Sequence, residues 1–404
     1  HVGLNVAADP LFTAAYTGVN GGLVIFVADD PGMHSSQNEQ DTRLIARAAK
    51  VPVLEPSDSQ ECKDFTRKAF EISEQFDTPI IVRLTTRVAH SQGLVELGER
   101  EDIPLKPYAK DPGKYVMMPA MARKRHVVVE ERLEKLTEYS NETPLNRIEW
   151  GDRKIGVITS GIAYQYAKEA FGNASFLKLG MVYPLPEKLI REFAAGVETI
   201  YVIEELEPFI EDHCLKMGIP VKGKALLPLI GEYNANLIRE RILGQKAEKL
   251  NNIEEEVPVR PPVMCPGCPH RGLFYVLKKL KLTVTGDIGC YTLGTLAPLE
   301  SMDTCVCMGA SVGMAHGMEK AMGRDAARKT VAVIGDSTFI HSGITGLIDI
   351  VYNKGTSTVV ILDNSITGMT GHQHNPTTGF TIKGEPTRQV DLVKLCQAVG
   401  VDRV

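Results

Sequence analysis

Three features are missing from this 404-residue sequence: a long hydrophobic run, an excess of positive charge and a visible signal peptide. No stretch reaches the ~18 consecutive apolar residues of a membrane-spanning helix, so no membrane partner is predicted. The formal net charge is −5, which argues against a nucleic-acid partner. Without a secretion signal we predict a cytoplasmic protein. Because the chain begins at His1 rather than Met, we expect it to be part of a longer protein.

A disulfide framework is missing as well, although the chain contains eight cysteines. Cys62, Cys214 and Cys396 are isolated, whereas the other five fall between residues 265 and 307. Secreted disulfide-rich proteins do not show this uneven placement. We interpret the isolated cysteines as buried small residues and the clustered ones as a metal or redox site.

The order of secondary structure can be read from the hydrophobic pattern. Strand-length apolar runs at 22–30 and 79–87 flank a stretch with helical periodicity at 59–76, for which Ser57 is the expected N-cap. Strands alternate with helices in the same way along most of the chain. The pattern predicts an α/β fold built from several doubly wound parallel sheets.

The length predicts two or three domains. Residues 111–150 are charged and interrupted by proline, and we interpret them as a linker. Domains are then predicted at 1–110, 151–252 and 256–404, the last following an acidic, proline-rich stretch.

A strand near the C-terminus runs directly into the sequence GDST at 335–338, and the next predicted strand ends just before Asn364. The glycine lets the backbone approach a phosphate, and the following helix presents free N–H groups and the positive end of its dipole. Asp336 is a hard carboxylate ligand for Mg²⁺, and Asn364 and the carbonyl of Ile366 add oxygens. Since parallel strands end side by side, these groups are predicted to meet at one ligand site.

This layout resembles the metal-diphosphate motif of thiamine diphosphate enzymes. The alternative is an ordinary strand–helix–strand unit with polar strand ends. The candidate cofactor-binding residues are Gly335, Asp336, Ser337, Thr338, Asn364, Ile366 and Thr370, and the candidate Mg²⁺ ligands are Asp336, Asn364 and Ile366.

The clustered cysteines begin with Cys265 and Cys268, which have the spacing of one metal-ligand pair, and Cys290 can supply a third thiolate. Cys305 or Cys307 can supply a fourth. Three interpretations remain: a 4Fe–4S cluster, a structural zinc site, and plain buried thiols. The thiamine motif favours the cluster, because the thiamine enamine is a low-potential electron donor.

Several longer segments resemble the 2-oxoacid:ferredoxin oxidoreductases, in particular the alpha subunits that act on indolepyruvate. The matching segments are 1–43, RLTTRVAHS at 83–91, VIEELEPFIE at 202–211, PPVMCPGCPHRG at 261–272 and the thiamine motif. The resemblance therefore covers essentially the whole chain.

The resemblance implies a pyrimidine-binding domain at 1–110, a transketolase-C-like domain at 151–252 and a diphosphate-binding domain at 256–404, with the active site between the first and the last. It implies oxidative decarboxylation of an aryl 2-oxo acid to an aryl-acetyl-CoA, with electrons passed to ferredoxin. The implied cofactors are thiamine diphosphate, Mg²⁺ and a 4Fe–4S cluster, with coenzyme A as co-substrate. The implied partners are a smaller beta subunit, ferredoxin and the 2-oxo acid.

The sequence departs from the family pattern in two places. The glutamate that activates the aminopyrimidine is expected N-terminal to His1, and Glu39 is a poor substitute. A ferredoxin-like domain with repeated CxxCxxC motifs is not in this sequence. Two alternatives therefore stay open: a non-oxidative thiamine decarboxylase or synthase, and a non-catalytic subunit that binds the cofactor.

Five residues are candidates for substrate contact or proton transfer. His34, Ser35 and Asn38 follow a strand end and can hold the substrate carboxylate or carbonyl, although Ser35 and Asn38 can instead cap the next helix. Met369 stands where relatives that use pyruvate carry a polar asparagine, which suits a bulky aromatic substrate; the alternative is simple packing on the cofactor ring. His372 is a candidate for proton transfer, with an ordinary loop histidine as the alternative.

Overall fold

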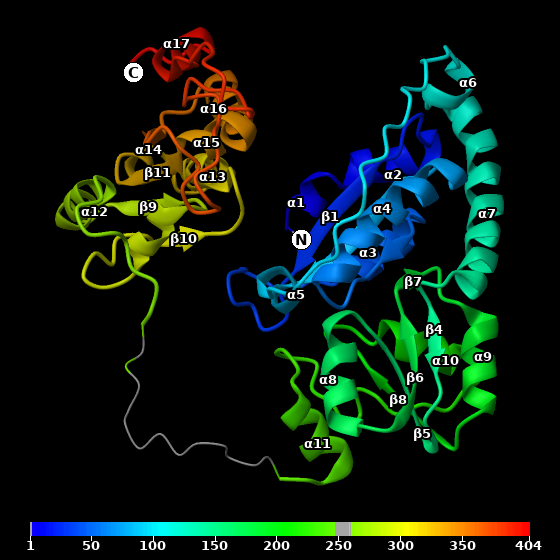
Figure 1. Cartoon of the computed structure of the whole chain (residues 1–404). Coiled ribbons are helices and arrows are strands. Elements are labelled where there is room, and N and C mark those ends of the chain that lie inside the picture. Colours follow the sequence, from blue (N-terminus) through cyan, green and yellow to red (C-terminus); the bar gives the residue numbers. More distant parts are fainter. Residues whose placement is uncertain (1, 247–257, 259) are drawn as a thin grey trace. The chain divides into compact units, whose positions relative to one another are not determined.

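The structure, a computed structural model, describes residues 2–246, 258 and 260–404. The chain divides into two units, residues 1–252 and 253–404, and each is described by itself (Figure 1). The predicted domain boundary at 252–256 lies outside the described residues. The described residues form three four-stranded sheets in which most strand pairs are parallel and joined by helical crossovers, which confirms the predicted α/β class.

The first unit contains two of these sheets and the helices around them. Its helices are α1 (Val2–Val6), α2 (Ala8–Thr17), α3 (Thr42–Ala49), α4 (Ser59–Phe76), α5 (Thr86–His90), α6 (Pro112–Tyr115), α7 (Pro119–Glu142), α8 (Gly161–Phe171), α9 (Glu187–Ala195), α10 (Phe209–Lys216) and α11 (Ala235–Leu243). Its strands are β1 (Val24–Asp29), β2 (Val53–Leu54), β3 (Ile80–Thr85), β4 (Arg147–Glu149), β5 (Asp152–Ser160), β6 (Ala174–Leu179), β7 (Met181–Tyr183) and β8 (Thr199–Ile203).

Both sheets of the first unit are parallel except for one edge strand each. The first sheet has the order β1-β3-β2-β7, with β7 antiparallel to β2, and the second has the order β4-β6-β5-β8, with β4 antiparallel to β6. Strand pairing therefore crosses the predicted boundary at residue 150 in both directions. The division of 1–252 into separate domains stays a prediction.

The segment 111–150, interpreted above as a linker, is largely folded. Helix α7 has 24 residues and packs against α2 and α9. It buries Val129, Arg132 and Leu136 on one side, and most of its other charged residues lie on the exposed side. The charge pattern alone did not reveal this packed face.

Helix α4 lies at the predicted residues, but its N-cap differs from the prediction. Asp58 is the N-cap, and its side chain accepts a hydrogen bond from the N–H of Glu61 (2.8 Å). The Ser57 N–H and hydroxyl instead donate to the Glu61 carboxylate, at 2.8 Å each. The expectation for Ser57 was therefore wrong by one residue, because the aspartate one position later caps the helix.

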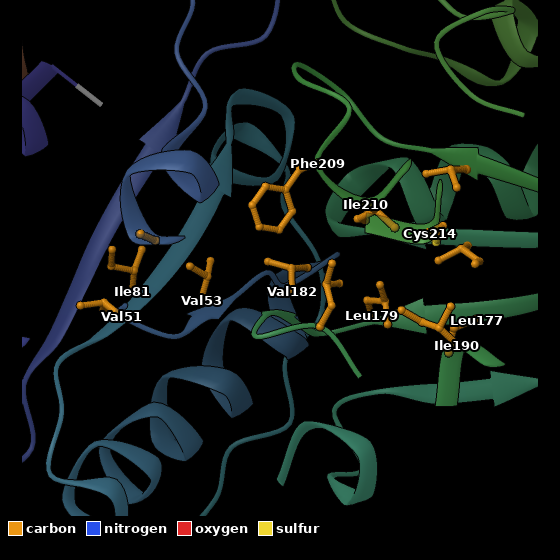
Figure 2. Close-up of a cluster of buried hydrophobic side chains, with 14 of the residues drawn as sticks. Val51, Val53, Ile81, Leu177, Leu179, Val182, Ile190, Phe209, Ile210 and Cys214 are labelled. Atoms are coloured by element: carbon orange, nitrogen blue, oxygen red, sulfur yellow. The ribbon is translucent and has the colours of Figure 1, made fainter. Parts of the chain in front are cut away.

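A continuous apolar core joins the two sheets of the first unit. Figure 2 shows Val53 and Ile81 of the first sheet in the same cluster as Leu177 and Leu179 of the second. Phe209, at the start of α10, belongs to the same cluster. Burial of such side chains contributes on the order of 1.5–3 kcal/mol each, so the two sheets form one packed unit.

The second unit has one sheet of order β10-β9-β11-β12, parallel throughout. Its elements are α12 (His270–Lys279), β9 (Thr283–Gly286), η1 (Cys290–Thr295), β10 (Thr304–Cys305), α13 (Ala310–Met322), α14 (Arg324–Ala327), β11 (Thr330–Gly335), α15 (Asp336–Thr338), the π-helical turn η2 (Phe339–Gly343), α16 (Ile344–Tyr352), β12 (Thr358–Leu362) and α17 (Leu392–Ala398).

Helices cover both faces of this sheet. Val331 and Val333 of β11 pack with Phe274 of α12 in one cluster. Ile334, one residue further, packs with Val312 of α13 and other residues in a second cluster. This alternation follows from the two-residue period of a strand, and it confirms the doubly wound arrangement for this unit.

Two further predictions from the sequence concern the burial of the isolated cysteines and the lack of a membrane-spanning helix. Cys214 and Cys396 are buried as predicted, whereas Cys62 is half-buried. Within the described part of the chain, no helix is long and apolar enough to cross a membrane.

Candidate functional site

The strand ends of the second unit bring the predicted diphosphate motif together. Gly335, the last residue of β11, pairs with Leu362, the last residue of β12. Asp336 therefore begins α15 beside the turn that carries Asn364. The helical segment continues through η2 into α16, so its N-terminal N–H groups face the same edge of the sheet.

A cavity of about 90 Å³ lies at this edge. It is lined by every residue predicted to bind the cofactor, namely Gly335, Asp336, Ser337, Thr338, Asn364, Ile366 and Thr370. Met369 and Cys290 line it too. The residues that the spacing argument selected thus line one cavity, although the role of each residue stays a prediction.

The cavity also contains residues that sequence reasoning missed. They are His270, Ile288, Gly289, Tyr291, Met308, Leu362, Thr367 and Gly368. Most of them come from α12 and from the segments that follow β9 and β10, whose strand ends lie along the same sheet edge. Only the sheet order could have revealed them.

Among the missed residues, His270 is the one whose side chain can take part in proton transfer near pH 7. It is 7% exposed and lies edge-on to the Tyr291 ring, with 6.4 Å between ring centroids. Burial lowers the pKa of His270, and the opposing attraction of the Asp336 carboxylate is weaker. Burial also raises the pKa of Tyr291. Both groups are therefore neutral around pH 7.

The two predicted side-chain ligands for Mg²⁺ differ in their surroundings. Asp336 is 3% exposed, whereas Asn364 is exposed and its Oδ1 accepts a long hydrogen bond from the Ile366 N–H (3.4 Å). Ser365, between Asn364 and Ile366, adopts a left-handed backbone (φ 51°), which turns the chain back toward the cavity. A carboxylate, an amide oxygen and a carbonyl fit Mg²⁺, whose remaining positions suit diphosphate oxygens and water.

The cysteine cluster separates into two groups. Burial raises the pKa of Cys290, and the nearby thiols of Cys265 and Cys268 raise it further. The pKa of Cys305 is raised by burial and by Asp287, with Cys307 as a further neighbour. Among residues 2–246, 258 and 260–404, no group of three or more His, Cys, Asp or Glu side chains is arranged to hold a metal ion. The iron–sulfur ligand set therefore stays a prediction.

The remaining candidates of the second unit lie on a small hairpin. Thr367 and Gln373 exchange backbone hydrogen bonds of 3.1 and 3.2 Å, and the residues between them form the tip. Met369 is 51% exposed there and lines the cavity. His372 has a left-handed backbone (φ 61°) and is not among the lining residues.

The candidates of the first unit lie in the loop after β1. Asp30 accepts hydrogen bonds from the Ser35 N–H and the Ser36 hydroxyl, at 2.8 Å each. Burial would raise the pKa of Asp30, but these bonds and one from Thr86 outweigh it, so the pKa lies below its ordinary value. The carboxylate thus fixes the backbone of the loop.

His34 and Asn38 take other partners in this loop. His34 Nε2 lies 3.1 Å from the Glu232 carboxylate, and the Gln40 amide donates to Asn38 Oδ1 (2.6 Å). The alternative that Ser35 and Asn38 cap the next helix is wrong, because Asp41 caps α3 by accepting from the Arg43 N–H.

A buried charge network behind this loop was not predicted. Arg83 donates from Nε to Asp29 (2.6 Å) and from Nη1 to Glu55 (2.7 Å). Arg43 donates from Nη1 to Glu204 (2.6 Å). All five side chains are buried, and they connect the carboxyl ends of β1, β2 and β8. Buried charges are tolerated only when paired in this way.

Comparison with known proteins places this arrangement in a family. The model of the C-terminal TPP-binding domain of thiamine pyrophosphate enzymes matches residues 287–404, which include most of the cavity. Indolepyruvate oxidoreductase subunit IorA of Archaeoglobus fulgidus is 44% identical over an alignment that covers 100% of this chain and 68% of that protein. The chain belongs to the indolepyruvate oxidoreductase IorA family. The relative of the same name from Pyrococcus horikoshii is 42% identical over 100% of this chain and 69% of its own.

Two further comparisons give matches to part of the chain. The model of the thiamine-diphosphate-binding domain of pyruvate flavodoxin/ferredoxin oxidoreductases matches residues 25–149. Among solved structures, the 2-oxoglutarate:ferredoxin oxidoreductase of Magnetococcus marinus aligns with 60% of this chain and 52% of its own, at 15% identity and a TM-score of 0.46. Residues 287–404 thus match a thiamine-pyrophosphate-binding domain model, within a chain whose whole length aligns with IorA subunits.

Proposed function

We propose that the chain is the thiamine-diphosphate-binding subunit of an indolepyruvate-type oxidoreductase. The enzyme decarboxylates an aryl 2-oxo acid, transfers the acyl group to coenzyme A and passes the electrons to ferredoxin. The proposal rests on one agreement: the cofactor motif and the family both indicate a thiamine diphosphate enzyme. Asp336 and Asn364 line one cavity, and the chain is 44% identical to an IorA subunit over its whole length.

The cofactor would be held by residues that already line the cavity. Asp336, Asn364 and the Ile366 carbonyl would bind Mg²⁺, and the backbone of 335–338 would bind the diphosphate. When bound, thiamine diphosphate supplies the nucleophilic carbon and the electron sink for loss of CO₂. Ile288 and Met308 add apolar side chains to the lining of the cavity.

The substrate would be selected by residues at the cavity and in the first unit. Met369 offers a flexible apolar surface to an aromatic ring, which favours an aryl substrate over pyruvate. His34, Ser35 and Asn38 are our candidates for the carboxylate or carbonyl of the substrate, and their loop is anchored by Asp30. His372 stays a candidate for proton transfer.

Electron transfer is proposed to use Cys265, Cys268 and Cys290 as ligands of a 4Fe–4S cluster. Thiolates are the donors that such clusters require, and the pKa of Cys290 responds to the other two thiols. A smaller beta subunit, ferredoxin and coenzyme A are the proposed partners. We also propose a cytoplasmic location, because eight free cysteines suit a reducing compartment.

Membership of the IorA family favours this proposal over the two alternatives from the sequence. A non-oxidative thiamine enzyme has no use for the thiol group beside the cavity. A non-catalytic subunit would bind the cofactor but would not support reduction of an electron acceptor.

The test is anaerobic purification of the full-length protein with its beta subunit, followed by quantification of thiamine diphosphate, iron and sulfide. We expect all three, together with reduction of an electron acceptor that requires both indolepyruvate and coenzyme A. CO₂ release without acceptor reduction would support the non-oxidative enzyme. Absence of both thiamine diphosphate and iron would refute the assignment of 335–364.

A pair of matched variants links activity to the cavity. Asp336→Asn removes the metal-binding carboxylate, and we expect loss of Mg²⁺-dependent cofactor binding and of activity. Asp349→Asn changes an exposed carboxylate on α16 and should leave both unchanged. Equal activity of the two variants would contradict the proposed metal site.

A further inference from the structure

The two oxygens of the Asp336 carboxylate have different partners. Oδ2 accepts a hydrogen bond from the Thr377 hydroxyl (2.7 Å) and a longer one from the Asn375 amide (3.3 Å). No described residue donates a hydrogen bond to Oδ1. Because Asp336 lines the cavity and is 3% exposed, its free oxygen is the one available to a ligand there.

Both donors are themselves buried and held in place. Thr377 is 1% exposed and Asn375 is 9% exposed. Asn375 Oδ1 accepts from the Thr377 N–H (2.8 Å), and the Thr378 hydroxyl donates to the Asn375 carbonyl (2.9 Å). These bonds close a tight turn over 375–378, so the donors reach Asp336 from a rigid segment.

The Thr377 hydroxyl donates its hydrogen bond to Asp336 rather than to Asn375. The hydroxyl oxygen lies 2.7 Å from Asp336 Oδ2 and 2.6 Å from Asn375 Oδ1, but it has one proton to donate. Asn375 Oδ1 already accepts from the Thr377 N–H. A bond to the ionised carboxylate is the stronger one, so the hydroxyl is committed to Oδ2.

The same turn is connected to a second lining residue of the cavity. The Asn375 amide lies 3.3 Å from the Thr367 hydroxyl, and Thr367 lines the cavity at the base of the 367–373 hairpin. Asn375 therefore couples the position of Asp336 to the hairpin that carries Met369. The contact with Asp336 joins residues 39 positions apart in the sequence.

We infer that Thr377 and Asn375 are positioning residues that hold Oδ2 of Asp336, so that Oδ1 is the oxygen that binds Mg²⁺. A carboxylate fixed on one side loses less freedom when the metal binds on the other. Without the clamp, Asp336 can rotate and the metal site loses its preset geometry. The inference deepens the proposed function, since it rests on a Mg²⁺–diphosphate cofactor in this cavity.

The test is calorimetric titration of Mg²⁺ into the full chain at saturating thiamine diphosphate. Thr377→Val keeps the shape of the side chain but removes the hydroxyl, and we expect about 10- to 100-fold weaker Mg²⁺ binding. Thr377→Ser restores the hydroxyl and should bind Mg²⁺ nearly as well as the natural protein. Thr387→Val, at an exposed threonine whose hydroxyl has no hydrogen-bond partner among the described residues, is the matched control.

A second readout separates positioning from general damage. Binding of thiamine diphosphate in the absence of Mg²⁺ should be the same in Thr377→Val and the natural protein. If Thr377→Val does not fold, Asn375→Ala removes the other donor and should weaken Mg²⁺ binding in the same direction. Unchanged Mg²⁺ affinity in these variants, or a serine variant as weak as the valine one, would overturn the inference alone. Failure of the natural protein to bind Mg²⁺ and thiamine diphosphate would overturn the proposed function with it.

Discussion

Glu205 gives the first unit a pH-dependent stability that can be measured directly. The residue follows β8, is 6% exposed and accepts a hydrogen bond from the Tyr233 N–H (2.8 Å). Burial raises its pKa to about 7 from an ordinary 4.5; Tyr233 and Arg83 oppose the rise, and the carboxylates of Glu55 and Glu232 add to it. The folded protein therefore keeps Glu205 protonated at pH values where the unfolded chain has already lost this proton.

The sign and size of the effect follow from these two pKa values. Because the pKa is higher in the folded state, the stabilisation is complete below pH 4.5 and is lost as the pH rises to about 7. The difference corresponds to about 3 kcal/mol in the free energy of unfolding. This is a large fraction of the stability of a typical domain.

Glu205→Gln removes the titration but keeps the size of the side chain. We expect the free energy of unfolding of the variant, measured by urea denaturation, to exceed that of the natural protein by about 3 kcal/mol above pH 7, relative to the difference at pH 4.5. Other titrating groups are common to both proteins and cancel. Glu207→Gln, at an exposed glutamate two residues away, should show no such pH-dependent difference. A difference between natural protein and Glu205→Gln that does not vary from pH 4.5 to 8 would refute this reasoning.

Four further predictions concern the charge network, the candidate substrate loop, the substrate and the thiols. Arg83→Met leaves two buried carboxylates unpaired and should lower the free energy of unfolding by about 3–5 kcal/mol; a loss below 1 kcal/mol in urea denaturation would contradict the paired network. Glu232→Gln weakens the partly exposed ion pairs of Glu232 with His34 and Arg87, so we expect a loss of stability of only about 1 kcal/mol but a raised KM for the 2-oxo acid. An unchanged KM would argue against a substrate role for the loop. Met369→Asn should shift the ratio of kcat/KM from indolepyruvate toward pyruvate, and an unchanged ratio would favour simple packing. Cys290→Ser should lower the iron content of the anaerobically purified protein, whereas Cys62→Ser, at an isolated cysteine, should retain it; iron in Cys290→Ser equal to that of the natural protein would exclude Cys290 as a ligand.

The sequence by itself determined the local pattern of the cofactor site. Strand β11, the turn at Asp336 and strand β12 were predictable because each follows from a short-range signal: an apolar run, a glycine turn or a polar strand end. The parallel pairing of Gly335 with Leu362 then places Asp336 near Asn364. Consecutive elements joined by one helix leave few alternatives for this geometry.

The tertiary structure decided what surrounds that pattern. His270 reaches the cavity from α12, and Thr377 reaches Asp336 from 41 residues further along the chain. The antiparallel edge strands β4 and β7 and the pairing of Arg83 with Glu55 depend in the same way on distant segments. The sequence shows that a hydrophobic or charged residue needs a partner, but it does not show which residue that partner is. The choice depends on sheet order and on packing between distant segments, because short-range propensities do not specify those contacts.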